Sequence, residues 1–545
     1  MKFQIAVITI LALLVISCKP YTKQVMAVIE QPVLPVLTLK ENNPVLKIKL
    51  IKTADSSSIL KEVVLSLEGT TSLNDIERVS LLRMCNNDEE SDLFVIGERE
   101  ATSSEVVIDS DLELVSDTTV LWVTVKLKDQ INLTDRICIS CIEIITDAGK
   151  VKLTGSKDTP TLRAGVALRQ HNQEGVDTYR IPGLSTSNRG TLLAIYDIRR
   201  DSDRDLQGDI DIGLSRSTDG GVSWKPMQTI LDMHNYGGLP EKYNGVSDAC
   251  ILVDTVSGDI YVAGLWMYGV LDPANGNFVE GLTDTSTTWN HQWRSFGSQP
   301  GYGIKRSSQF LIVKSSDDGL TWSEPVNITK QVKKAKWCLL APAPGSGITI
   351  ADGTLVFPSE GIDEEGKRFS TITYSKNSGK TWQTGNPAYY NTNECTVAEL
   401  TDHSLMLNMR ERSNRGKIEA NGRAIAVTSD MGEHWTEHST SRNALIESAC
   451  MASLYRHNYT HDGIEKSVLL FTNPDSYTQR NNFTLKVSFD DGKSWPQDKW
   501  ILLDEYEGNG YSCITAVNDS IIGILYEGSQ SNLVFQQIPL DEIIN

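Results

Sequence analysis

Hydrophobic and polar residues alternate over short stretches between about residues 20 and 160. In VLKIKLIK (45–52) the aliphatic side chains of Leu46, Ile48 and Leu50 lie on one face of the strand, and Lys47 and Lys49 lie on the other. LWVTVKLK (121–128) alternates in the same way. A period of two, interrupted by polar loops, predicts antiparallel strands with one buried face. We therefore predict a β-sandwich over residues 19–160, an accessory domain that ends in the polar linker LTGSKDTP (153–160).

A second pattern begins after residue 160, where one motif recurs five times. The copies are RSTDGGVSW (216–224), KSSDDGLTW (314–322), YSKNSGKTW (374–382), VTSDMGEHW (427–435) and VSFDDGKSW (487–495). Their tryptophans are separated by 98, 60, 53 and 60 residues. Such a period, with strands and tight turns, predicts a β-propeller. At about 60 residues a blade, we expect residues 161–545 to form an all-β six-bladed propeller, in which the long gap requires a blade without the motif or an insertion near 283–303.

The chemistry of the motif indicates a structural role. Asp-x-Gly fits a hairpin turn, in which glycine takes a positive φ and the carboxylate accepts turn N–H groups. Asn377 replaces the aspartate in the third copy and Thr428 replaces the serine in the fourth. Both residues keep a side chain that can make the hydrogen bonds of the turn. A catalytic role for the aspartate would be lost in the third copy, because asparagine has no carboxylate. The motif resembles the Asp-box, or bacterial neuraminidase, repeat, which also occurs in propellers that cleave nothing.

The first residues have the composition of an export signal. An apolar run from Ile5 to Ile16 follows a single lysine and is too short to span a bilayer. Cys18 after VIS resembles the lipobox of bacterial lipoproteins, so residues 1–18 predict a lipoprotein signal peptide; a plain signal peptide is the alternative. We expect an exported outer-membrane lipoprotein, periplasmic or on the cell surface, that contacts membrane only through its lipid anchor.

Composition and charge limit the classes of partner and cofactor that the protein can bind. Charged residues make up 22% and hydrophobic residues 40% of the chain, as in soluble globular proteins. The net charge of -19 argues against nucleic acid and anionic membrane surfaces. Only Cys138 and Cys141 form a C-x-x-C pair, which is insufficient for a structural zinc site. No EF-hand spacing supports calcium, and we expect no metal or cofactor.

Several charged residues and one tyrosine stand in strand-like settings outside the repeats. Each is most simply a surface salt-bridge partner, but propeller strands converge on a central cavity, so the group predicts a site. YRIPG (179–183) resembles the Phe/Tyr-Arg-Ile-Pro signature of bacterial exo-α-sialidases (neuraminidases), and residues 165–545 resemble the Bacteroides-type members, which carry an N-terminal sandwich. The resemblance implies that Arg180, Arg410 and Arg480 form an arginine triad and that Asp205 is the acid/base. It further implies that Tyr511 is the nucleophile with Glu394 as its partner, and that Glu527 is the acid that orients Arg180. Arg199 and Asp248 match family positions on the hydroxyl side of the sugar.

Three of these positions have competitors. Arg200 adjoins Arg199, Glu399 competes with Glu394, and Tyr506 with Tyr511.

The implied roles are chemically consistent. Arginine forks bind planar carboxylates such as that of sialic acid, and they explain how an acidic protein holds an anion. A phenol nucleophile avoids the repulsion that a carboxylate would meet there, and it needs a neighbouring base. The resemblance thus implies cofactor-free hydrolysis, with retained configuration, of terminal α-linked sialic acids on glycoproteins, glycolipids and oligosaccharides.

Two other functions remain open at this level. A non-catalytic, sialoglycan-binding Asp-box propeller would need the repeats but not the polar group. A trans-sialidase, or an enzyme that forms an anhydro sugar, would share the nucleophile and differ in acceptor-site aromatics, for which Trp289 and Trp293 are candidates. The N-terminal domain either binds carbohydrate or packs against the propeller.

Overall fold

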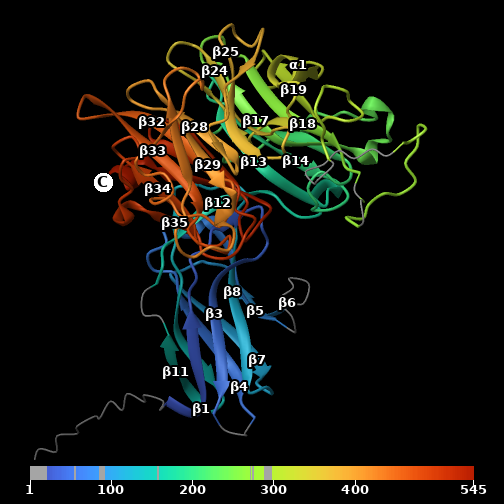
Figure 1. The fold of residues 1–545 in the computed structure, drawn as a ribbon. Helices are drawn as coiled ribbons and strands as arrows, with labels where there is room; N and C mark the ends of the chain where they lie inside the picture. The colour runs from blue at the N-terminus through green and yellow to red at the C-terminus, as the bar shows by residue number, and fades with distance from the viewer. Residues whose placement is uncertain are drawn as a thin grey trace, which may run out of the picture.

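The computed structural model describes residues 21–545 except 54–56, 85–92, 156–158, 271, 273–274 and 288–296. The predicted signal peptide with Cys18, and both Trp289 and Trp293, lie outside the described residues. The chain is all-β, as predicted, and forms an elongated N-terminal domain below a broader C-terminal one (Figure 1). Its α-helices are short, α1 (Thr329–Val332) and α2 (Leu540–Ile544), and no helix in the described ranges is long and apolar enough to cross a membrane.

The N-terminal domain is built on one nine-stranded sheet. The strands follow the order β6-β5-β8-β3-β1-β11-β10-β4-β7. The end strands β6 and β7 contact each other, and Arg99 of β6 forms an ion pair with Asp109 of β7. The sheet therefore curves around a largely aliphatic core, which continues into the C-terminal domain at residues such as Tyr179 and Phe535. Its strands are β1 (Tyr21–Glu30), β3 (Asn43–Lys52), β4 (Ile59–Ser66), β5 (Ile76–Met84), β6 (Leu93–Arg99), β7 (Glu105–Glu113), β8 (Thr118–Leu127), β10 (Ser140–Thr146) and β11 (Gly149–Gly155).

The C-terminal domain is built from sets of four main strands, antiparallel within each set; the first two sets are joined into one nine-stranded sheet by a parallel pair between Ile210 and Gly245. In chain order they start with β13 (Thr178–Thr186), β14 (Leu192–Arg199), β15 (Ile210–Ser217) and β16 (Gln228–Leu231), then β17 (Asn244–Val253), β18 (Ile260–Tyr268), β19 (Gln309–Ser315) and β20 (Val326–Asn327). The next are β21 (Leu339–Pro342), β24 (Leu355–Ile362), β25 (Arg368–Ser375) and β26 (Gln383–Thr384), then β28 (Thr392–Glu399), β29 (Leu405–Glu411), β30 (Ala424–Thr428) and β31 (Thr436–Glu437). The series ends with β32 (Ser453–His461), β33 (Ile464–Pro474), β34 (Phe483–Ser488) and β35 (Ile501–Asp504).

A further sheet joins the two ends of this domain. In it β12 (Leu162–Arg169) pairs with β38 (Leu533–Pro539), next to β37 (Ile521–Tyr526) and β36 (Ser512–Asn518). The strands β13, β17, β24, β28, β32 and β36 contact one another in succession, and β36 returns to β13, which closes a ring. On the outer edge β2 (Val36–Thr38) pairs with β12, so a strand from the predicted N-terminal domain extends this sheet.

The repeated motif forms the turns between the third and fourth strands, as its chemistry predicted. In the first copy Ser217 Oγ accepts the Gly221 N–H at 2.8 Å and Asp219 Oδ1 accepts the Ser223 N–H at 3.0 Å. Asn377 Oδ1 accepts the Thr381 N–H in the same way, at 3.0 Å. The long gap between the first two copies is an insertion, because residues 269–308 separate β18 from β19 within one sheet.

Candidate active site

Three strands of the inner ring carry a bulge at the positions of predicted site residues. The pairing register shifts between Arg180 and Gly183 of β13, around Asp248 of β17, and around Glu394 of β28. Ile181 and Asp248 have φ values of 60° and 54°, which are costly for side chains with a Cβ. A bulge re-aims side chains that regular pleating would direct elsewhere. The ring therefore presents these residues together at one end of its axis.

Arg180 is held by Glu527, which follows β37. Arg180 Nε and Nη2 donate to the two carboxylate oxygens at 2.6 and 3.2 Å. The same carboxylate accepts the Ile181 N–H at 2.8 Å and the Tyr511 N–H at 3.1 Å. The side chain of Glu527 is only 1% exposed. Glu527 thus fixes the guanidinium and the backbone beside the tyrosine at once.

The Tyr511 side chain lies between a carboxylate and a guanidinium. Its hydroxyl donates to Glu394 Oε1 at 2.6 Å, and Arg410 Nη1 donates to Glu394 Oε2 at 2.6 Å and to the Tyr511 hydroxyl at 3.2 Å. Burial opposes the ionisation of Glu394, but the charge of Arg410 and the hydrogen bonds from Tyr511 and Arg410 outweigh it and lower its pKa. Burial and the charge of Glu394 raise the pKa of Tyr511 well above its ordinary value. A neutral phenol therefore faces an ionised base.

The other two predicted arginines of the triad approach the same ring. Arg180 and Arg480 place their guanidinium carbons 5.7 and 5.5 Å from the Tyr511 ring centre. Arg480 Nη1 donates to the Asn509 carbonyl at 2.8 Å. With Arg410 at the hydroxyl, three guanidinium groups surround the tyrosine, an arrangement suited to a planar anion.

Arg199 and Asp205 form a second charged pair in the site. Arg199 is buried and donates to Asp197 Oδ2 at 3.0 Å and to Asp205 Oδ1 at 3.2 Å. The carboxylate of Asp205 remains half exposed on the loop after β14. Asp248 is buried nearby, and burial followed by the charges of Asp205 and Glu360 raises its pKa well above the ordinary value.

These side chains enclose a cavity of about 350 Å³. Eight of the nine predicted site residues line it, while Glu527 stands behind Arg180. Six arginines and four carboxylates contribute to the lining, so the cavity carries local positive charge in an acidic protein. Its lining residues are Arg180, Ile181, Arg199, Asp205, Asp248, Glu360, Arg368, Asn393, Glu394, Arg410, Arg412, Arg480 and Tyr511.

The sequence did not identify Glu360, Arg368, Asn393 or Arg412 as part of the site. One signal was present, because Glu360 is the only charged residue in the strand sequence LVFPSEGI (355–362). Burial, reinforced by the charge of Glu394, raises the pKa of Glu360 to about 7. Besides Asp205, Asp248 and Glu394, the cavity therefore holds a fourth carboxyl group, whose pKa is raised to about 7.

The three competing residues lie outside this cavity. Arg200 forms ion pairs with Asp209 and Asp211. Glu399 accepts hydrogen bonds from the Ala351 N–H and contacts His403 at the other end of β28. Tyr506 is 39% exposed.

Possible metal-ligating groups are likewise separate from the cavity. Within the described residues, Asp232, His234 and Glu241 form one such group at the surface, and Asp430, Glu433 and His434 form another. Asp430 is already used by the turn of the fourth repeat, where it accepts the His434 N–H at 2.9 Å.

Comparisons with known proteins agree with this geometry. Residues 181–498 match the family model of a BNR repeat-like domain, and residues 24–94 match the N-terminal domain of BNR-repeat neuraminidase. The chain is 37% identical over 538 residues to a sialidase of Bacteroides fragilis (strain YCH46), with 94% of each chain covered.

Solved structures extend the likeness to the fold. Hadza microbial sialidase Hz136 is 33% identical and has a TM-score of 0.84, covering 95% of this chain and 100% of its own. A Trypanosoma rangeli sialidase, solved in complex with 2,3-difluorosialic acid, is 20% identical with a TM-score of 0.54 over 70% of this chain and 58% of its own, which shows the fold alone.

The fold and the sequence similarity define a glycoside hydrolase of the sialidase class, with an N-terminal domain ahead of a propeller. The chain belongs to the bacterial sialidase family with BNR repeats. The predicted family membership is thereby confirmed.

Proposed function

We propose that the protein is an exo-α-sialidase that hydrolyses terminal α-linked sialic acids with retained configuration. The observation that carries this proposal is the contact between the Tyr511 hydroxyl and Glu394 at 2.6 Å, inside a ring of three arginines. A binding-only propeller would have no need of a phenol paired with an ionised carboxylate.

Substrate binding follows from the charges. The carboxylate of the sugar binds to Arg180, Arg410 and Arg480, which places its anomeric carbon next to the Tyr511 ring. Arg180 is already fixed by Glu527, so little ordering is needed on binding. The sugar hydroxyls face Arg199 and Asp248, which line the same cavity.

Chemistry then proceeds in two displacements. Glu394 takes the phenolic proton while the Tyr511 oxygen bonds to the anomeric carbon, and Asp205 protonates the departing glycosidic oxygen. Asp205 next takes a proton from water, the water oxygen bonds to the anomeric carbon, and the Tyr511 oxygen leaves and regains a proton from Glu394. Two inversions give net retention.

Three finer features complete the proposal. The closed ring of inner strands supports a six-bladed propeller over residues 161–545, in which β12 completes the last blade. The contact between β6 and β7 supports a sandwich-like N-terminal domain over residues 19–160. The composition of residues 1–18 supports export as an outer-membrane lipoprotein.

The test compares wild type with Tyr511→Phe on the methylumbelliferyl α-sialoside. We expect turnover by wild type and a loss of roughly a thousandfold or more in kcat for the variant. Tyr506→Phe is the matched control and should retain wild-type kcat. An active Tyr511→Phe would overturn the nucleophile, and an inactive, folded wild type would overturn the enzyme. Proton NMR of the first product separates the α-anomer of free sialic acid from a transferred or anhydro sugar.

A further inference from the structure

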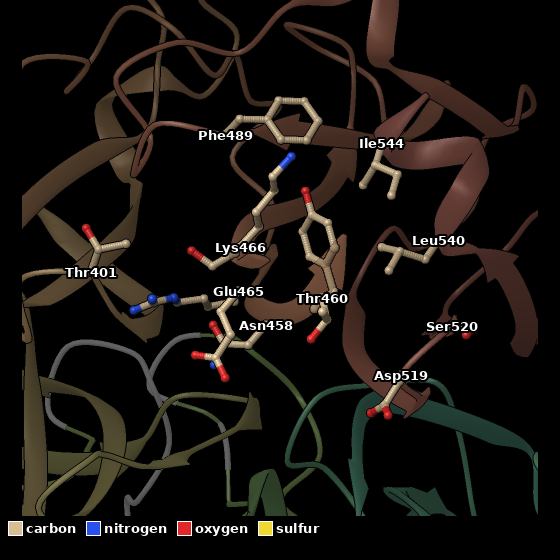
Figure 2. A pocket seen from close by; sticks show the side chains of 13 residues that line it. Thr401, Asn458, Thr460, Glu465, Lys466, Phe489, Asp519, Ser520, Leu540 and Ile544 are labelled. Carbon is tan, nitrogen blue, oxygen red and sulfur yellow. The ribbon is translucent and has the colours of Figure 1, made fainter. Parts of the chain in front are cut away.

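A large groove lies near the C-terminus of the chain, outside the candidate active site. It has a volume of about 1230 Å³ and is bordered by the β32–β33 hairpin, the turn of the fifth repeat, the β36–β37 turn and α2. Figure 2 shows Phe489 on one side of the groove, Asp519 on the opposite side, and Leu540 and Ile544 of α2 along one wall.

The groove opens at the end of the propeller opposite the arginines. On β13, Arg180 lines the active-site cavity, while Thr186 at the far end of the strand lines another cavity of about 500 Å³. That second cavity shares Arg456, Asn458 and Asp519 with the groove. Six residues of extended strand separate Arg180 from Thr186, about 20 Å. A ligand in the groove therefore does not touch Tyr511.

Phe489 distinguishes the fifth repeat from the other four. It occupies the position after the conserved serine or threonine, where the other copies carry Thr218, Ser316, Lys376 and Ser429. Its side chain is 44% exposed, so the turn does not bury it. The turn forms equally well with a small polar residue, and an exposed aromatic ring at the mouth of a groove supplies a flat apolar surface for a ligand.

Polar side chains without partners also line the groove. Within the described residues, Asn458, Glu465 and Lys466 make no hydrogen bond or ion pair through their side chains, and all three are exposed in the groove. Figure 2 shows Lys466 extending toward Phe489. An amide, a carboxylate and an ammonium group supply both donors and acceptors, which vicinal hydroxyl groups require.

We propose that this groove is a second, non-catalytic binding site for a neutral oligosaccharide. The apolar face of a pyranose lies on Phe489, and its hydroxyls bind Asn458, Glu465 and Lys466. The site differs in charge from the active-site cavity, because Arg456 and Lys466 are balanced by Glu465 and Asp519. This balance favours an uncharged sugar over a sialic acid.

Such a site would act with the catalytic one on branched glycans. When one branch of a glycan is bound in the groove, its other branches stay close to the active-site cavity of the same propeller or of a nearby molecule. Their effective concentration at that cavity is thereby raised. The inference goes beyond the proposed hydrolysis and does not depend on Tyr511, since the ligand lacks sialic acid.

The experiment is saturation-transfer NMR of the full chain with lacto-N-neotetraose, a neutral tetrasaccharide. We compare wild type with Phe489→Ser, which restores the small polar residue of other copies. Leu320→Ser is the matched control, because Leu320 is 55% exposed in the turn of the second repeat and lies outside the groove. We expect saturation of the sugar protons by wild type and Leu320→Ser, and affinity lower by on the order of tenfold in Phe489→Ser.

Three outcomes would overturn the proposal: no saturation by wild type at millimolar sugar, equal affinity in Phe489→Ser and wild type, or an equal loss in Leu320→Ser. Turnover of the small α-sialoside by Phe489→Ser should match wild type, which checks that the variant folds. A failure of hydrolysis in wild type bears only on the proposed function, because binding of the tetrasaccharide is measured independently.

Discussion

Glu527 binds Arg180 through both carboxylate oxygens, and the same oxygens accept the backbone N–H groups of Ile181 and Tyr511. One buried carboxylate therefore joins a strand at the start of the propeller to the segment that carries the tyrosine, more than 300 residues later. The guanidinium position and the backbone position of Tyr511 are set together. Ile181 adopts its unfavourable positive φ where this carboxylate captures its N–H group.

Replacement of Glu527 by glutamine tests that coupling. Glu527→Gln removes the charge and puts an amide donor among N–H donors, so Arg180 loses its bidentate partner. We expect kcat/KM to fall by about 100-fold, mainly through KM, in steady-state assays of the α-sialoside. Glu399→Gln is the matched control at the other end of the propeller. A kcat/KM within twofold of wild type for Glu527→Gln would show that Arg180 holds its position unaided.

How much of this arrangement could be predicted depends on whether its cause is local. The turns of the repeats are local, so Ser217 and Asp219 could be assigned from the motif alone. The bulge at Ile181 and the burial of Glu360 arise only when distant strands close into a ring, and no short stretch encodes them. The same holds for β2, whose three residues give no sign that they pair with β12.

The structural role of the repeats predicts an asymmetry between two substitutions of Asp219. Asp219→Ala deletes the acceptor of the Ser223 N–H and Ser217 hydroxyl, which we expect to destabilise the protein by about 1 to 3 kcal/mol. Asp219→Asn should lose much less, since Asn377 makes the equivalent contacts in the third repeat. Urea unfolding measures both, and kcat of the folded variants should match wild type. Equal losses for alanine and asparagine would argue against the hydrogen-bonding role.

The buried Glu360 predicts a dependence of stability on pH. Its pKa in the folded protein, about 7, lies above the ordinary value of 4.5, because burial and the charge of Glu394 disfavour ionisation. The folded form keeps a proton that the unfolded chain releases, so this contribution is complete below pH 4.5 and is lost as pH rises through 7. The shift corresponds to about 3 kcal/mol.

Glu360→Gln should remove that dependence. Its melting temperature relative to wild type should therefore rise between pH 5 and pH 8, as measured by scanning fluorimetry. Glu465→Gln, at an exposed position outside the cavity, should show no such change. A difference between Glu360→Gln and wild type that stays constant with pH would contradict the raised pKa.

A fully buried ion pair between Arg423 and Glu447 anchors the backbone next to Arg410. Arg423 Nη1 donates to Glu447 Oε2 at 2.7 Å, and both side chains are 0% exposed. Glu447 Oε1 accepts the Glu411 N–H at 2.7 Å, next to Arg410, and Arg423 Nη1 also donates to the carbonyl of Cys450, which packs with Tyr511. The pair thus connects the strand that bears Arg410 to the wall behind the tyrosine.

Breaking this pair from one side should cost more than removing it. Arg423→Met leaves the carboxylate of Glu447 buried without its counter-charge, and we expect a loss of about 3 to 5 kcal/mol in urea unfolding. Glu447→Leu leaves the guanidinium in the same position and should cost a similar amount. The double variant contains neither charge and leaves none unpaired, so its loss should be clearly smaller than the sum of the two single losses. Strict additivity would mean that the two charges do not stabilise each other in the folded protein.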